Sequence, residues 1–170
     1  KRAIKKCNIS EEFKELFRKI MENPEIFSQK LPEIKERIIT LKKEDFEKTD
    51  DEIKNLIIDY HYISFSDGNS IPLKYKDYLQ AYSLNKTKKH ISCCDCYVYD
   101  EVAGDYMTTK IYKASRLLKK DKFNEALSIN QLCVTKDFFN ANINEFRSIL
   151  KGKTIEFVDK NNTCFISLPL

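Results

Sequence analysis

The spacing of apolar residues predicts three helices in the first third of the chain. Ser10 is a favourable N-cap, and the apolar residues that follow it recur at helical spacing to residue 23. A second, shorter helix is predicted over 32–41, a segment that starts with a proline in the first turn. The third begins at the capping box Thr49-x-x-Glu52, in which each side chain accepts a hydrogen bond from the other residue's backbone N–H.

The pattern then changes from helical spacing to alternation. Residues 61–66 alternate as a strand, Asp67-Gly68 supplies a tight turn, and 71–73 is predicted to return as a second strand. Three helices followed by a hairpin is the order of elements in a winged helix. A fourth helix is predicted over 75–84, with tyrosines along one side.

The second half of the chain repeats this order. The predicted elements are a helix capped by Thr108 or Thr109, a helix that begins at the capping box Ser128-x-x-Gln131, a helix over 143–150 that stops at Gly152, and strands over 154–158 and 164–168. Two copies that each end in a hairpin are a more specific pattern than one copy.

The predicted fold class is therefore mainly α with small β hairpins (α+β), arranged as tandem winged helix-turn-helix units. The first unit is assigned to 1–84 and the second to 106–170. Residues 85–105 are interpreted as a joint that is partly packed, because its Ile, Val and Tyr residues are too apolar for a free linker.

Composition narrows the class of protein. Of the 170 residues, 42% are apolar and 33% charged, and this apolar fraction is too high for a disordered tail. No run approaches the roughly 18 apolar residues of a membrane span, so we expect no membrane partner.

The net charge is +4, and from Tyr106 onward there are 11 basic residues and 6 acidic ones. This half is mildly basic, far less so than a dedicated DNA-binding arm.

The sharpest local cluster of chemistry is His90-x-x-Cys93-Cys94-x-Cys96. Zinc takes four tetrahedral nitrogen or sulfur ligands, which makes His90, Cys93 and Cys96 candidates. A second paired motif is absent from the sequence, and a fourth ligand would have to come from a distant residue such as Cys133. The interpretation favoured here is reduced, buried cysteines with no metal and no other cofactor.

Catalytic signatures are also missing from the sequence. Cysteine–histidine chemistry would have to use His61 or His90, the two histidines of the chain, and neither sits in a catalytic motif. The chain has no Gly-rich phosphate loop, HExxH or GxSxG. We therefore expect a protein that is not an enzyme and takes no small-molecule substrate.

Candidate binding residues lie in both halves. A winged helix typically contacts DNA through its third helix and wing, which in the second unit carry Arg147, Lys151, Lys153 and Lys160. Charge reversal at Lys151 and Lys153 is predicted to weaken any nucleic-acid contact while leaving the fold intact.

The tyrosines of the fourth helix suggest a different partner. Tyr75, Tyr78 and Tyr82 recur on one side of the predicted helix. Because aromatic residues are enriched at protein interfaces, this side is interpreted as a protein-binding face.

The order and spacing over Ser10–Leu73 and Thr108–Leu168 resemble the C-terminal half of the Stn-type subunit of the CST telomere-capping complex, a family related to the middle subunit of replication protein A. The resemblance implies a telomerase-associated protein of the nucleus and chromosome telomere. It also implies docking to other subunits of a telomere or DNA-replication complex, with single-stranded or duplex DNA as a further partner. No catalytic residues follow from it, and the cysteine cluster has no counterpart in it.

Two hypotheses about function remain open at this point. One is a non-catalytic docking module of a telomere-maintenance or replication complex. The other is a sequence-specific DNA-binding winged-helix transcriptional regulator. They differ in salt dependence, because duplex binding weakens steeply as salt rises and docking between proteins does not.

Overall fold

A computed structural model describes residues 37–68, 72, 75–97, 111–112, 127–159 and 161–169, together with residues 15, 18 and 22. Of the helix predicted over 10–23, the three described residues are helical. The helix predicted to begin at Thr108 or Thr109 is wrong where it can be checked, because Ile111 and Tyr112 form a short strand, and the rest of it lies outside the described residues. The strand predicted over 71–73, apart from Pro72, also lies outside them, as does Lys160.

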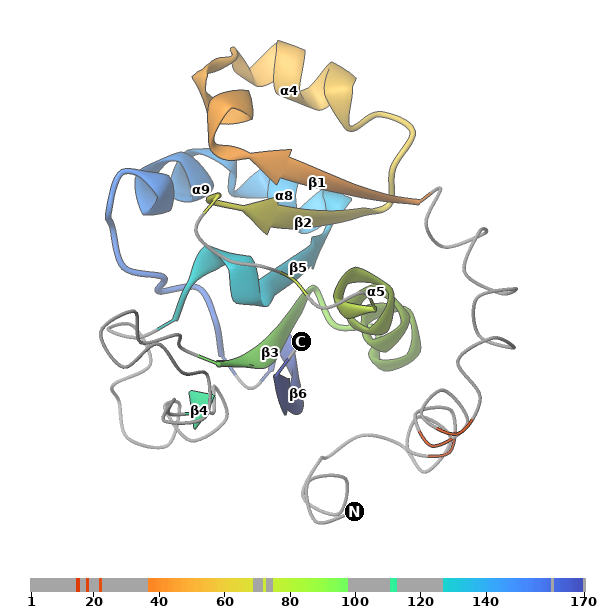
Figure 1. The fold of residues 1–170 in the computed structure, drawn as a ribbon. Coiled ribbons are helices and arrows are strands. Elements are labelled where there is room, and N and C mark those ends of the chain that lie inside the picture. The colour runs from red at the N-terminus through yellow and green to blue at the C-terminus, as the bar shows by residue number, and fades with distance from the viewer. Residues whose placement is uncertain are drawn as a thin grey trace.

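A single mixed β-sheet organises the described part of the chain (Figure 1). Its strands, in the order in which they lie across the sheet, are β1 (Ile38–Lys42), β2 (Tyr62–Ser66), β5 (Leu132–Thr135), β3 (Ile91–Tyr97) and β6 (Thr163–Pro169). The pairs β1–β2 and β3–β6 are parallel, whereas β5 is antiparallel to both of its neighbours. A short strand, β4 (Ile111–Tyr112), pairs antiparallel with the end of β3.

This sheet shows that the prediction of tandem winged helices is wrong. The segments 1–84, 85–105 and 106–170 all contribute strands to it, and β5 lies between β2 and β3. The hairpin predicted for the second unit does not form, because β6 pairs in parallel with β3 and 154–158 is not a strand. The fold is α/β.

Two segments that were predicted as helices have a different structure. One overlaps a strand, and the other is a single turn that leads into a strand. The segment predicted as a helix over 32–41 contains β1, whose Ile-Ile-Thr run is β-branched and pairs with β2. The capping box of Ser128 and Gln131 is present, but it opens a single 3-10 turn, η5 (Ile129–Gln131), that runs directly into β5.

Other local predictions are confirmed. The capping box of Thr49 and Glu52 begins α4 (Asp50–Leu56), and α5 (Lys76–Thr87) covers the helix predicted over 75–84. The helix predicted over 143–150 is α9 (Ile143–Leu150), and Gly152 follows its end at a φ of 98°. An L-residue rarely adopts this φ, so glycine is the residue that ends the helix at low cost.

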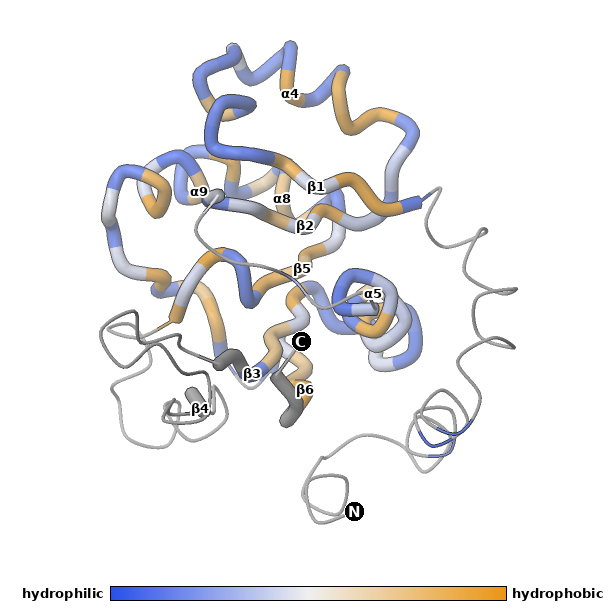
Figure 2. Tube along the Cα trace, viewed as in Figure 1, coloured by the Kyte–Doolittle hydropathy of each residue, from blue (hydrophilic) through white to orange (hydrophobic). Residues whose placement is uncertain are grey.

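The two faces of the sheet differ in chemistry. One face builds the main apolar core with side chains of η2 (Lys43–Glu47), α4, α8 (Lys136–Ala141) and α9; these include Phe46, Ile53, Phe139 and Phe146. The other face is covered by α5, whose Leu84 packs against Cys133 and Cys164. Figure 2 shows hydrophobic positions concentrated in the strands and a mostly hydrophilic run from the end of β1 through η2. No helix in the described part of the chain has the length and apolarity to cross a membrane.

Candidate functional site

The guanidinium of Arg147 forms hydrogen bonds with other residues of the same chain. Arg147 projects from α9 and donates to the backbone carbonyls of Phe46 and Lys48, each at 2.5 Å, and to the carboxylate of Asp50 at 2.8 Å. These contacts hold the connection between η2 and α4 against α9. As a nucleic-acid ligand, Arg147 would first have to give up these bonds.

The other two described candidates for phosphate binding, Lys151 and Lys153, lie close together and apart from the guanidinium of Arg147. Lys151 and Lys153 are both exposed just after α9. Lys153 Nζ donates to the Glu145 carboxylate at 2.8 Å, and this hydrogen bond and the charge of Glu145 raise the pKa of Lys153. The structure therefore brings Lys151 and Lys153 together at one exposed turn, while Arg147 points toward η2.

The tyrosines predicted as a protein-binding face lie on or beside α5 with unequal exposure. Tyr78 is buried and stacks with half-buried Tyr82 at 6.3 Å between ring centroids. Lys86 Nζ lies 5.7 Å from the centre of the Tyr82 ring. Tyr75 is half-buried just before the helix. Only part of this side of α5 is therefore accessible to a partner.

The predicted zinc ligands do not converge in the described part of the chain. Because successive residues of a strand face opposite sides, Cys93 joins the main core and Cys94 faces α5. His90 is exposed, and its ring stacks on Phe138 with 6.2 Å between centroids. Among the described residues, no three His, Cys, Asp or Glu side chains are close enough to hold a metal ion.

The described cysteines belong to the interior of the protein. Cys93, Cys94, Cys133 and Cys164 are free and buried, as the sequence predicts. Burial raises the pKa of the Cys133 thiol, so it stays protonated and is a poor nucleophile.

A row of small polar side chains crosses the sheet beneath α5, and sequence analysis missed it. The strand register places them side by side, one on each strand, in the order Thr40, Ser64, Cys133, Ser92 and Cys164. Small side chains let a helix approach a sheet closely, and α5 fills the space with polar groups of its own. Alternation of polar residues in 62–66 usually indicates a solvent-facing side, which is why the sequence concealed this layer.

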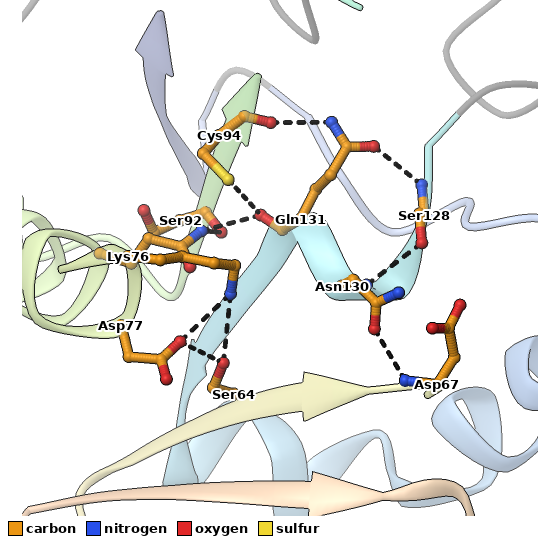
Figure 3. A network of polar contacts seen from close by, with 10 residues as sticks. Ser64, Asp67, Lys76, Asp77, Ser92, Cys94, Ser128, Asn130 and Gln131 are labelled. Atoms are coloured by element: carbon orange, nitrogen blue, oxygen red, sulfur yellow. Dashed lines mark hydrogen bonds and ion pairs between the residues drawn. The ribbon is translucent and has the colours of Figure 1, made fainter. Parts of the chain in front are cut away.

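The layer contains a partly buried ion pair between Lys76 and Asp77 (Figure 3). Lys76 Nζ donates to Ser64 Oγ and to Asp77 Oδ1, both at 3.2 Å, and Ser64 Oγ donates to Asp77 Oδ1 at 2.6 Å. Lys76 and Ser64 are 3% and 1% exposed. These contacts fix the start of α5 on β2.

Two glutamines complete the attachment of α5 to the sheet. Gln80 Nε2 donates to the carbonyls of Ser92 at 3.2 Å and Gln131 at 2.8 Å. Gln131 Nε2 in turn donates to the carbonyl of Cys94 at 2.8 Å (Figure 3). These bonds join α5, β3 and η5, and they give the polar layer a structural role.

The open edge of the sheet at β1 is the described feature with the clearest capacity to bind. The N–H of Tyr62 donates to the carbonyl of Arg37, which fixes the side of β1 that faces β2. Because the backbone groups of alternate residues point to opposite sides of a strand, those of Ile38, Thr40 and Lys42 point away from β2. The N–H of Lys42 is taken by Asp45 Oδ2 at 2.9 Å. In the described residues, β1 has no other strand beside it, and Thr40 and Lys42 are exposed.

The opposite edge of the sheet, at β6, is less exposed to solvent than β1. On β6, Thr163, Cys164 and Ile166 are 4%, 8% and 1% exposed, so the backbone there is covered as well as the side chains. An accessible edge of the sheet is therefore found at β1.

The chain was compared with known proteins, and no family model, curated protein or solved structure matches it.

Proposed function

We propose that this protein is a non-catalytic docking domain that binds a partner protein by adding an extended segment of that partner to the edge of its sheet at β1. The observation that supports this proposal is the outward-facing backbone of Ile38 and Thr40 on an exposed edge strand. Strand addition is an established mode of peptide recognition in which main-chain hydrogen bonds supply affinity.

The rest of the architecture fits a binding surface that is rigid before the partner arrives. Leu41 is 1% exposed and anchors β1 in the main core, while Arg147 holds the segment that follows β1 onto α9. A rigid edge loses little conformational entropy on binding, so more of the interaction energy appears as affinity. Each new backbone hydrogen bond contributes about 0.5–1.5 kcal/mol net.

The proposal keeps the docking part of the sequence hypothesis and leaves out its telomeric part. The resemblance to the Stn-type subunit depended on the order of elements in two winged helices, and the sheet does not have that order. Docking through an edge strand depends only on β1 and its surroundings.

The test uses a proline on the outer side of β1. Thr40→Pro removes an N–H that points away from β2, so the β1–β2 ladder keeps its hydrogen bonds while the edge loses a donor and gains a ring in the path of an incoming strand. Thr40→Ala is the matched control, because it shortens the side chain and keeps the N–H. The two variants are compared by thermal melting to verify that both are folded.

Peptides selected from a random library on the native chain are then measured against both variants. We expect binding to survive in Thr40→Ala and to fall at least about tenfold in Thr40→Pro, a loss of about 1.4 kcal/mol. Hydrogen exchange of the Ile38 and Thr40 amides is expected to slow when peptide is bound. Peptides that bind Thr40→Pro as well as the native chain would refute docking at this edge.

A second measurement addresses nucleic acid. Duplex and single-stranded DNA are titrated against the native chain and against a Lys151→Glu, Lys153→Glu variant at rising salt. Tight duplex binding with a steep salt dependence, lost in that variant, would favour a DNA-binding function over docking.

A further inference from the structure

The edge strand carries charge of one sign. Arg37, Lys42 and Lys43 are all exposed, and no acidic residue occurs from 37 to 43. Arg37 precedes β1, Lys42 is its last residue and Lys43 opens η2, so a strand that pairs with β1 brings its end residues close to these bases.

The acidic residues that follow β1 cancel little of this charge at the edge. Asp45 accepts a hydrogen bond from the backbone of Lys42 and forms an ion pair with Lys48 at 2.5 Å, so its carboxylate is already occupied. Glu44 is exposed and follows Lys43 in η2, so it offsets one of the three bases, and both ends of β1 keep a net positive charge.

A second copy of this chain is a poor occupant of the edge. Two β1 strands that pair antiparallel about Thr40 would bring Arg37, just before the strand in one copy, close to Lys42 and Lys43 at the end of the strand in the other, and the reverse at the other end. Like charges directly opposite each other destabilise a strand pair. The same basic residues that disfavour self-association favour an acidic strand from another protein.

The middle of β1 is apolar and favours apolar residues in a partner strand. Ile38 and Ile39 are both half-buried, and Ile39 packs against the main core at the edge of the sheet. Because their side chains point to opposite faces of the sheet, a β-branched residue opposite each of them would cover the exposed parts of both.

From this arrangement we infer that the segment which docks on β1 is an extended peptide with a β-branched aliphatic centre and acidic residues at both ends. The inference rests on the proposed docking function and adds the chemistry of the partner. It commits to a protein segment, and a nucleic-acid strand is an outcome of the test.

The experiment uses three synthetic peptides with the same Val-Thr-Val centre and with flanks of glutamate, glutamine or lysine. Their affinities for the full chain are measured by fluorescence anisotropy at low and at physiological salt. We expect the glutamate peptide to bind about tenfold more tightly than the lysine peptide, with the glutamine peptide between them.

Charge reversal on the protein supplies the decisive comparison. In an Arg37→Glu, Lys43→Glu variant the order of the three peptides is expected to invert. A Lys151→Glu variant, which changes an exposed base after α9, is expected to keep the native order.

The outcomes separate the two proposals. Equal binding of all three peptides, each lost in Thr40→Pro, would overturn the charge inference and leave edge docking standing. Failure of every peptide to bind the native chain would overturn both. Displacement of the glutamate peptide by single-stranded DNA with a steep salt dependence would overturn the acidic-peptide inference in favour of a nucleic-acid ligand.

Discussion

Phe146 lies at the centre of an aromatic cluster in the main core, and its truncation is the sharpest test of the core. It is 0% exposed. Its ring centroid is 4.9 Å from that of Phe65, 5.0 Å from that of Phe157 and 5.1 Å from that of Phe139. One residue of α9 thus contacts β2, α8 and the segment after the helix.

Truncation to alanine is expected to remove a large part of the stability of the domain. Phe→Ala substitutions in cores cost about 3–5 kcal/mol. Each aromatic pair can add about 0.5–1.5 kcal/mol beyond the buried area, and the four pairs of Phe146, which include a T-shaped contact with Phe138, are lost at once. Since such terms are not additive, we expect the upper end of the range, about 5 kcal/mol, against a typical total of about 5–15 kcal/mol.

Urea unfolding followed by circular dichroism measures this loss. Phe146→Leu is the control, because it keeps an apolar side chain of intermediate volume, and we expect it to cost about 1–2 kcal/mol. If the alanine variant does not fold, the leucine variant still reports on the site. A loss below about 2 kcal/mol for Phe146→Ala, with an unchanged urea dependence, would refute the placement of α9 against β2.

Three further perturbations test separate features by urea unfolding. Arg147→Ala should destabilise by about 2 kcal/mol, because two backbone carbonyls and the Asp50 carboxylate lose a charged donor that is only partly exposed to water. For Cys133, burial raises the pKa above its ordinary value of 9.0, so the unfolded chain ionises first as the pH rises. The free energy of unfolding should then fall above about pH 9 by about 1.4 kcal/mol per pH unit from this thiol, and Cys133→Ala should remove that contribution. Gly152→Ala should cost about 1–2 kcal/mol, because the φ of 98° disfavours any side chain although nothing obstructs the new methyl group.

Each of these predictions has its own contrary result. Arg147→Lys should recover part of the stability that Arg147→Ala loses. If the alanine variant is as stable as the native chain, the hydrogen bonds of Arg147 contribute nothing to stability. An alkaline slope that is unchanged in Cys133→Ala would assign it to other groups such as Tyr62, whose pKa is also raised by burial. A fully stable Gly152→Ala would show that the end of α9 does not need the left-handed conformation.

Local signals in the sequence predicted helices whose boundaries are marked by neighbouring residues. The capping box at Thr49 and the glycine at 152 are such signals, and α4 and α9 are where they place them. The strands were harder to predict, because apolar residues at 34, 38 and 41 fit a helical period as well as they fit β1. The capping box at Ser128 was correctly recognised, yet a single turn can carry it before a strand begins.

The candidate site could not be predicted from any local pattern. A strand becomes an edge only through the pairing of the other strands, and those partners come from distant parts of the chain. The polar layer beneath α5 was hidden for a similar reason, since Ser64 and Ser92 look solvent-facing until the helix that covers them is known. The residues of the proposed edge lie in a segment whose apolar spacing predicted a helix.

The position of β5 has a consequence for how the polypeptide is made. While the ribosome has released only the residues before Leu132, β2 and β3 lack the strand that joins them, and the nascent chain holds two incomplete pieces of sheet. Assembly must wait until Leu132–Thr135 has been synthesised, when β5 can insert between strands made before it. A premature stop upstream of residue 132 would therefore yield a product with unpaired strand edges. Such edges promote aggregation and are bound by chaperones.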